Sequence, residues 1–300
     1  MEGKTCLITG GSDGIGYAAA RELAHAGARV VIVGRNAAKT DDAVRRIVAE
    51  TGNPAVERLL ADLSSQAEVR RVAAEALGLL PRLDVLLNNA GAIFLSSRRS
   101  VDGLEMTFAL NHLGYFLLTA LLLDRLRDSA PARIINVSSS AHGSPGKFRL
   151  EDLPRPGAGS SPLRFVTGER GYRAYGRSKL CNILFTYELA RRLEGTGVSV
   201  NALHPGLVQT NIARNNGLLG RVVNFFIGAR GVDADRGAET LVYLASSPEV
   251  EGVTGKFFVD CRAVPSSALS YDRDLAARLW EMSERLTARD DAGLEGMPSP

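Results

Sequence analysis

Cysteine is scarce in this 300-residue chain, which contains three: Cys6, Cys181 and Cys261. Their number is odd and no Cys-x-x-Cys pair occurs, which excludes a disulfide framework and a dithiol redox motif. We therefore expect reduced, mostly structural thiols in a reducing compartment. Histidine is also rare, and the four imidazoles show no metal-ligand spacing. The sequence therefore predicts no metal site.

No charge of one sign dominates, because 36 Lys and Arg stand against 33 Asp and Glu, a net charge of +3. Without a basic stripe interleaved with aromatic residues, the composition excludes a nucleic-acid-binding protein. Long hydrophobic runs are missing too. The most apolar stretch, residues 115–123, is about half the length that a membrane-spanning helix needs, and the first residues lack the pattern of a signal peptide. We expect a cytoplasmic protein without a transmembrane anchor.

Short apolar segments alternate with amphipathic ones, which is typical of βα units around a parallel sheet. Most of the apolar segments are continuous Val, Ile and Leu runs, as expected for strands covered by helices on both faces. Strand patterns occupy residues 5–9, 29–33, 56–60, 85–88, 133–137, 198–203 and 256–259. Helical patterns occupy residues 15–26, 37–50, 66–77, 105–127, 174–194, 233–246 and 271–287. We predict one α/β domain, a Rossmann-type doubly wound parallel sheet of about seven strands in three α/β/α layers.

Two segments break this alternation. Residues 143–171 are rich in Gly, Pro and charge, which indicates an inserted loop. Residues 207–232 follow a strand and mix apolar residues with Gly, which indicates a lid over the substrate. Residues 261–300 form a C-terminal tail in which only 271–287 has a helical pattern.

A glycine-rich turn, residues 9–16, joins the first strand to the first helix. Glycines at positions 10, 14 and 16 allow a tight turn, a close approach of the backbone to a pyrophosphate and close packing of helix on strand. The helix N-terminus would then present free N–H groups to the phosphate. No Gly-Lys-Ser/Thr closes the turn, which excludes a Walker loop; an ordinary strand–helix connection is the alternative. The predicted phosphate site comprises Gly10, Ser12, Asp13, Gly14, Ile15 and Gly16.

Cofactor choice depends on the residue after the second strand, which is Arg35. A guanidinium can pair with the 2′-phosphate of NADP, whereas an acidic residue here would bind the ribose hydroxyl of NAD. The carboxylate of Asp13 would repel a nearby phosphate, which weighs against NADP. The alternative for Arg35 is that it is a solvated surface residue with no part in binding. NADP is therefore favoured and NAD is less favoured. Asp62 and its neighbour Leu63, after the third strand, are candidates for the adenine edge, with a helix-capping role for the stretch Asp62–Ser65 as the alternative.

Tyr175 and Lys179 lie four residues apart on a helical segment, so they share one face. The pKa of tyrosine is ordinarily about 10, and a neighbouring cation lowers it toward the working pH of a general acid or base. The alternative is that the two residues are an ordinary pair of surface side chains.

Ser138 and Ser139 follow a strand, at the edge of the sheet where ligands bind. The alternative is that their hydroxyl groups only cap the chain where it leaves the strand. Asn111 stands in an apolar run, where a buried amide needs partners; it is a structural hydrogen bonder or part of a proton relay.

In this order and spacing, the motifs resemble those of the short-chain dehydrogenase/reductase family, and within it the retinol dehydrogenase-like branch. The resemblance covers residues 5–260. The motifs that carry it are TGGSDGIG (9–16), NNAG (88–91), NHLG (111–114), VSSSAH (137–142), YGRSK (175–179) and HPGLVQT (204–210).

The resemblance implies four catalytic roles. Tyr175 exchanges the proton with the substrate oxygen, and Ser139, rather than Ser138, hydrogen-bonds that oxygen. Lys179 binds the nicotinamide ribose and lowers the pKa of Tyr175, while Asn111 positions a water that connects Lys179 to solvent. The resemblance also implies further cofactor contacts by Asn89, Ala90, Gly91, Pro205, Gly206, Val208 and Thr210.

The expected activity is NADP(H)-dependent hydride transfer to or from a small lipophilic aldehyde, ketone or alcohol. Two alternatives stay open: reduction of a large cyclic substrate of the steroid or tetrapyrrole type, and a non-catalytic NADP-binding sensor. Helices 105–127 and 174–194 resemble those through which the family forms dimers or tetramers, and this branch also includes monomers. A homodimer is therefore one of the states that stay open. Membrane-bound members of this branch carry an N-terminal hydrophobic anchor that the sequence does not show. This weakens the inference that the substrate is a retinoid.

Overall fold

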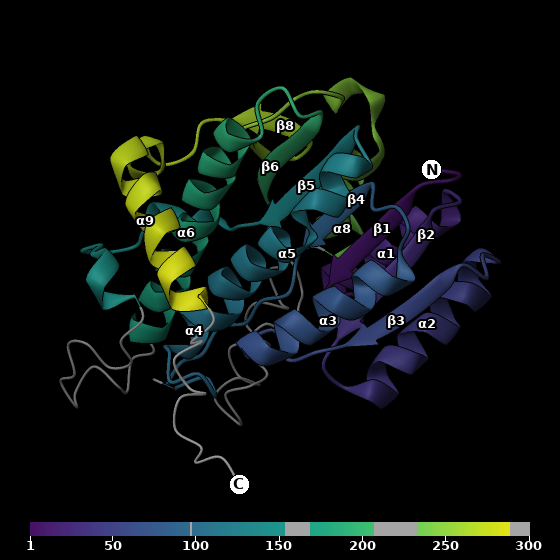
Figure 1. Ribbon diagram of the computed structural model, residues 1–300, viewed down its shortest axis with the longest axis horizontal. Coiled ribbons are helices and arrows are strands. Elements are labelled where there is room, and N and C mark those ends of the chain that lie inside the picture. The colour runs from purple at the N-terminus through teal and green to yellow at the C-terminus, as the bar shows by residue number, and fades with distance from the viewer. Residues whose placement is uncertain (97, 154–168, 207–232, 289–300) are drawn as a thin grey trace, which may run out of the picture.

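The computed structural model describes residues 1–96, 98–153, 169–206 and 233–288. Eight strands form one sheet in the order β3-β2-β1-β4-β5-β6-β7-β8 (Figure 1). All neighbouring strands pair in parallel except β7 and β8, which pair antiparallel. The strands are β1 (Thr5–Thr9), β2 (Arg29–Gly34), β3 (Val56–Leu60), β4 (Val85–Asn88), β5 (Ala132–Val137), β6 (Val198–His204), β7 (Lys256–Val259) and β8 (Arg262–Val264).

Helices cover both faces of the sheet, which confirms the three-layer Rossmann-type prediction. The side chains of α3, α5 and α6 pack on one face, and those of α1, α2 and α8 on the other. Helix α9 lies outside α6 and packs against it (Figure 1). The α-helices are α1 (Gly14–His25), α2 (Ala37–Thr51), α3 (Gln66–Leu79), α4 (Met106–Phe108), α5 (Gly114–Asp128), α6 (Glu169–Arg192), α8 (Ala234–Ser246) and α9 (Arg273–Thr287).

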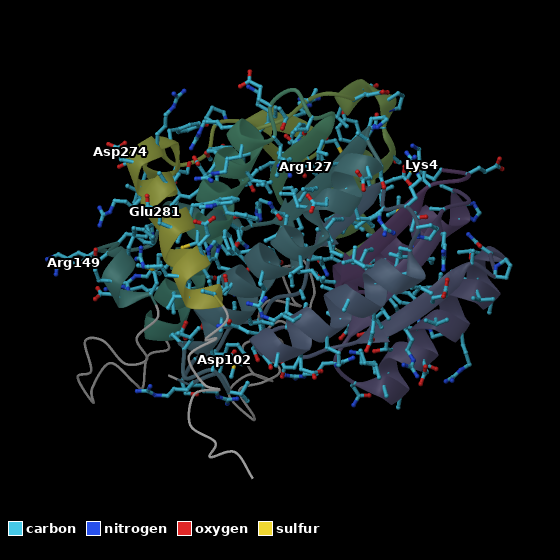
Figure 2. All side chains as sticks on the ribbon, viewed as in Figure 1. Lys4, Asp102, Arg127, Arg149, Asp274 and Glu281 are labelled. Carbon is cyan, nitrogen blue, oxygen red and sulfur yellow. The ribbon has the colours of Figure 1, made fainter. Side chains whose placement is uncertain are left out.

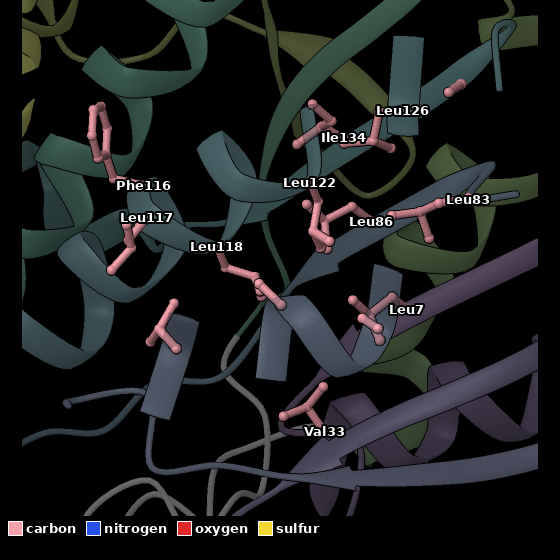
Figure 3. Packing of buried hydrophobic residues seen from close by; sticks show 14 of the residues in the cluster. Leu7, Val33, Leu83, Leu86, Phe116, Leu117, Leu118, Leu122, Leu126 and Ile134 are labelled. Carbon is pink, nitrogen blue, oxygen red and sulfur yellow. The ribbon is translucent and has the colours of Figure 1, made fainter. Parts of the chain in front are cut away.

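The central strands are buried because both of their faces are apolar. Figure 3 shows one layer of this core, in which Leu7 of β1, Leu86 of β4 and Leu122 of α5 pack together. Most charged residues lie on the outside instead, and Arg149 and Asp274, for example, are exposed at the periphery of the molecule (Figure 2). This separation of apolar and charged side chains fixes the sheet between its helical layers.

The seven predicted strands are present, each within one residue of its predicted bounds. The sequence pattern missed β8, an exposed strand of three residues that we had assigned to the tail. It follows β7 through Asp260 and Cys261, whose φ angles are +47° and +60°. This tight reversal uses a left-handed backbone without glycine, so no turn signal marks it.

The predicted helix 105–127 is present as one helical stretch, but its backbone hydrogen bonding changes within it. It consists of α4, a π-helical turn (Ala109–Leu113) and α5. By length and composition the whole stretch, Met106–Asp128, could cross a membrane, but most of it is buried within the fold, like the core helix of a folded domain. Helix α6 begins at Glu169, so the predicted inserted loop 143–171 ends earlier than expected; its residues 154–168 lie outside the described part of the chain, as does the predicted lid 207–232.

The sheet order reverses between β1 and β4. The turns that follow these two strands therefore diverge at the carboxyl edge, the position at which open α/β sheets bind ligands. Gly10 follows β1 and Asn89 follows β4, so the glycine-rich turn lies at this switch point.

Candidate active site

The turn between β1 and α1 is closely packed. Gly10 has a φ of +69°, which favours glycine. A Cβ atom on Gly16 would lie 2.4 Å from the carbonyl oxygen of Gly10 and from Nδ2 of Asn89, so only glycine fits there. Asp13 caps α1 by accepting a hydrogen bond from the Gly14 amide at 2.9 Å. The turn therefore brings the N-terminus of α1 close to the end of β1.

A cavity of about 350 Å³ extends from this turn along the carboxyl edge of the sheet. The predicted residues that line it are Gly10, Ser12, Asp13, Gly14, Ile15, Gly16, Arg35, Asp62, Leu63, Asn89, Ala90, Gly91, Ser139, Tyr175, Lys179, Pro205 and Gly206. Asn111 is buried behind the wall rather than in it. The predicted contacts Val208 and Thr210 lie outside the described residues. Sequence reasoning missed Val33, Gly34, Ala61, Ala92, Ile93, Leu110, Tyr172 and His204 as lining residues.

Thr9 ties the glycine-rich turn to the end of β4. Its hydroxyl oxygen accepts hydrogen bonds from the amides of Asn89 and Ala90, at 2.9 and 3.0 Å. The Asn89 side chain donates in return to the Thr9 carbonyl at 2.9 Å. These bonds hold the two loops at the switch point in one fixed arrangement.

Two ion pairs mark the end of the cavity near β2. Arg35 lies 3.7 Å from a carboxylate oxygen of Asp62, and Lys39, one turn into α2, pairs with Asp13. Asp62 also accepts from the amide and hydroxyl of Ser64, whereas Ser65 caps α3. The stretch Asp62–Ser65 therefore does cap a helix, through Ser65, which leaves Asp62 at the cavity. Sequence reasoning missed Lys39, because its ion pair with Asp13 joins segments that are far apart in the sequence.

Tyr175, Lys179 and Ser139 meet at the other end of the cavity, as the sequence predicted. Tyr175 is buried and shares a side-chain hydrogen bond with Ser139. Lys179, on the same face of α6, donates from Nζ to the carbonyl oxygen of Val137 at 2.9 Å and lies 5.6 Å from the centre of the Tyr175 ring. The arrangement places a phenol, a hydroxyl and an amine around one point of the cavity.

The pKa values of this pair differ from the expectation. Burial raises the pKa of Tyr175 to about 12, which outweighs the lowering by its hydrogen bond with Ser139. Burial also lowers the pKa of Lys179 to about 7. The pKa of Tyr175 in this structure is therefore raised rather than lowered, because burial disfavours the charged form of both groups, and the lowering by Lys179 stays a prediction.

Asn111 lies in the π-helical turn and is fully buried. Its Oδ1 accepts from the Ala92 amide, and its Nδ2 donates to the Ala92 carbonyl, both at 3.0 Å. Nδ2 also donates to the hydroxyl of Ser178 at 3.1 Å. The side chain therefore joins the loop after β4 to α6, beside Lys179; its action in a water relay stays a prediction. π-Helical turns are frequent at functional sites.

The wall beside Tyr175 is apolar. Ile93, Leu95, Ala141 and Tyr175 pack together there, and Ile93 lines the cavity. Tyr172, one turn before Tyr175 on α6, also lines the cavity and is 50% exposed. This end can accommodate an apolar molecule.

The cavity fits a nicotinamide dinucleotide on two observations. The cradle at Gly10 and Gly16 has no room for a side chain, as close approach to a pyrophosphate requires. Arg35 then lies at one end of the cavity and the buried Tyr175–Lys179 pair at the other. Among the described residues, no group of three His, Cys, Asp or Glu side chains is placed to hold a metal ion.

Comparisons with known proteins agree with this geometry. A family model described as short chain dehydrogenase matches residues 4–149, and one described as Enoyl-(Acyl carrier protein) reductase matches residues 161–261. The chain is 43% identical to retinol dehydrogenase 14 of Mus musculus, over 95% of this chain and 86% of the relative.

Two solved structures share the fold over most of their length. An uncharacterized protein from Mycobacterium paratuberculosis is 35% identical, with a TM-score of 0.73 over 95% of this chain and 94% of that one. The Pseudomonas aeruginosa RhlG/NADP active-site complex is 31% identical, with a TM-score of 0.66 over 86% and 94%. The chain therefore belongs to the short-chain dehydrogenase/reductase family, as a retinol dehydrogenase-like, NAD(P)-dependent oxidoreductase.

Proposed function

We propose that this protein transfers a hydride between NADP(H) and the carbonyl or alcohol carbon of a lipophilic substrate. The observation that carries the proposal is one cavity that joins the glycine-rich turn to Tyr175, Ser139 and Lys179. A nucleotide that lies along this cavity from the turn toward Lys179 would bring its nicotinamide beside Tyr175. When bound, the nicotinamide supplies or accepts the hydride.

Tyr175 exchanges the proton of the reaction. With a pKa raised to about 12, its phenol keeps its proton near neutral pH and can donate it to a carbonyl oxygen as that oxygen gains charge. Ser139, already hydrogen-bonded to Tyr175, lies where its hydroxyl can bond the same oxygen. Two donors that converge on the developing oxyanion orient the carbonyl and stabilise the transition state.

Lys179 supports this exchange from the cavity wall, and Asn111 supports it from behind that wall. Lys179 is held by the Val137 carbonyl, and its pKa of about 7 lets it take up or release a proton near neutrality. Asn111 fixes Ser178, the residue before Lys179, against the loop after β4. We infer that this brace keeps the ammonium within reach of the nicotinamide ribose.

The charge at the β2 end of the cavity supports a preference for NADP. Arg35 and Lys39 are two cations at the end of the cavity where the adenosine ribose of a nucleotide in this orientation would lie. A 2′-phosphate would compete with Asp62 and Asp13 for them and form charge-assisted hydrogen bonds. The relative in complex with NADP supports the same choice.

The apolar wall of the cavity, to which Ile93 and Tyr172 contribute, supports a lipophilic substrate. These side chains stand beside Tyr175, where the carbonyl must lie, so an apolar chain or ring next to the carbonyl would be buried against them. The similarity to retinol dehydrogenase 14 supports this substrate class.

The test compares the wild-type protein with Tyr175→Phe, which keeps the ring and removes the hydroxyl. NADPH and NADH are titrated into both proteins by fluorescence, and NADPH oxidation is then followed with medium-chain aldehydes, retinal and steroid ketones. We expect both proteins to bind NADPH more tightly than NADH, and only the wild type to oxidise NADPH. Binding without turnover on any carbonyl would favour a nucleotide-binding sensor, and no binding would contradict the proposal.

A further inference from the structure

His142 contacts the backbone of Ser139 twice. The carbonyl oxygen of Ser139 accepts one hydrogen bond from the backbone amide of His142 at 3.1 Å and another from its Nδ1 at 2.6 Å. The other ring nitrogen, Nε2, accepts a hydrogen bond from the amide of Ser267 at 3.0 Å. The imidazole thus lies between the residue beside Tyr175 and a segment 125 positions further along the chain.

These partners determine which ring nitrogen carries the proton. A carbonyl oxygen only accepts, so Nδ1 must donate to Ser139, and a backbone amide only donates, so Nε2 must accept from Ser267. The ring is therefore neutral, with its proton on Nδ1. A protonated ring would point an Nε2–H group at the Ser267 amide and lose that bond. Burial lowers the pKa of His142 in the same direction.

The surroundings of the ring leave it one orientation. Its edge packs against Phe257 of β7, with the ring centres 4.9 Å apart. His204, at the end of β6, is a titratable neighbour, and its pKa is lowered by burial and by His142. The side chain of His142 is buried. Rotation of the ring would cost both hydrogen bonds in a place with little water to replace them.

Ser267 is itself held by a chain of hydroxyl groups. The Ser266 hydroxyl bonds to Tyr187 at 2.7 Å and to Ser270 at 2.6 Å, and Ser270 donates to the Ser267 carbonyl at 2.6 Å. Tyr187 belongs to α6, the helix that carries Tyr175 and Lys179. Hydrogen bonds thus connect Ser139, through His142 and Ser267, to the helix that carries Tyr175 and Lys179.

We propose that His142 is a positioning residue for Ser139, and that the turn at residues 266–270 anchors it. Because the Ser139 carbonyl is held by His142, the extended backbone of Ser139 (φ −164°, ψ 157°) stays fixed, and its hydroxyl stays directed at Tyr175. The inference rests on the proposed function only in that Ser139 bonds the reacting oxygen. It explains why a segment beyond the parallel sheet contacts the site.

The test uses three substitutions that separate the two hydrogen bonds. His142→Asn keeps a donor near the place of Nδ1, His142→Gln keeps an acceptor near the place of Nε2, and His142→Ala keeps neither. We expect His142→Asn to retain kcat within about threefold, and the Gln and Ala variants to lose about tenfold or more, because small displacements of a positioned group reduce rates by such factors. The Kd for NADPH should not change in any of them.

Thermal unfolding of each variant separates positioning from stability. If His142 were only structural, kcat would follow the unfolding temperature, and the Asn and Gln variants would behave alike. Equal loss of kcat in His142→Asn and His142→Ala, or a fully active His142→Gln, would overturn the proposal.

A second readout needs no turnover. In nitrogen NMR spectra of the ¹⁵N-histidine-labelled wild-type protein, we expect His142 to carry its proton on Nδ1 at neutral pH, with an unprotonated Nε2. A proton on Nε2 would overturn the proposal by itself. A protein that binds NADPH but reduces no carbonyl contradicts the proposed function instead, and the nitrogen spectrum then decides whether the imidazole has the inferred contacts.

Discussion

Ser138 and Ser139 are adjacent in the sequence, but their hydroxyl groups have different partners. The hydroxyl of Ser138 is buried and donates to the carbonyl oxygen of Lys179 at 2.8 Å. The hydroxyl of Ser139 accepts from the Ala141 amide at 3.2 Å and bonds to Tyr175 at the cavity. One serine therefore braces the catalytic helix, and the other faces the place of the substrate.

This difference predicts different effects of two matched substitutions. Ser139→Ala should lower kcat by about 10²-fold, as removal of a donor to a developing oxyanion does. Ser138→Ala should instead reduce the free energy of unfolding by about 1 kcal/mol through loss of one buried hydrogen bond, with a much smaller change in kcat. Steady-state kinetics and urea unfolding of both variants check this. A larger kcat loss in Ser138→Ala would reverse the assignment.

The pKa of Tyr175 predicts opposite pH dependences for the two directions. Because the phenol holds its proton up to about pH 12, carbonyl reduction should be nearly independent of the ionisation of Tyr175 between about pH 7 and pH 9. Alcohol oxidation needs the phenolate, so its kcat/KM should rise about tenfold per pH unit over the same range. Initial rates in both directions measure this, and a reduction rate that climbs equally steeply would be inconsistent with it.

Charge at the β2 end of the cavity predicts cofactor preference. Arg35→Ser and Lys39→Met should each weaken NADPH binding about fivefold to tenfold and leave NADH nearly unchanged, because only NADPH carries the 2′-phosphate. Asp13→Asn keeps the helix cap but removes the charge paired with Lys39, so it should tighten NADPH binding. Fluorescence titrations at low and high salt check these shifts, which should shrink as salt screens the charges. Equal effects on both nucleotides would argue against a 2′-phosphate site.

Tyr172 predicts a substrate effect that is separate from nucleotide binding. Its ring is half exposed at the cavity, so Tyr172→Ala should raise the KM for a lipophilic carbonyl about tenfold through loss of apolar contact area. Tyr172→Phe is the matched control and should keep the wild-type KM. The Kd for NADPH should be the same in all three proteins, and an unchanged KM in Tyr172→Ala would place the substrate elsewhere.

His112 predicts a loss of stability in acid. Burial lowers its pKa from the usual 6.5 to about 4. Between these two pH values the unfolded chain binds a proton that the folded chain does not, so stability falls as the pH falls through this range, by about 3 kcal/mol in total. Urea unfolding at about pH 7 and about pH 4.5 measures it. His112→Asn should be less stable at neutral pH but lose less between the two values; an equal loss would assign the effect to other groups.

Much of the fold could be predicted from sequence because it follows from local patterns. Strands such as β4 and β7 are short apolar runs between polar segments, and burial on both faces needs nothing more. Tyr175, Lys179 and the glycine-rich turn were recognisable in the same way, since each motif lies within one helix turn or one loop. For these the chain order alone determined which residues share a face.

Other features depended on contacts between distant segments. The Lys39–Asp13 ion pair and the link from Ser139 through His142 to Ser267 join residues far apart in the sequence, and no local pattern specifies them. The π-helical turn at Asn111 lies where that side chain bonds the loop after β4, which the sequence does not show.

The pKa of Tyr175 also depends on the tertiary structure and not on the local sequence alone. From the sequence, a cation four residues away should lower it, and that spacing was correct. In the folded protein burial raises it, because the fold packs both side chains away from water, which disfavours the charged form of each. The sequence by itself determined that Tyr175 and Lys179 lie side by side on one helix. Only the tertiary structure decided how far the two side chains are exposed to solvent, and solvent exposure sets their pKa values.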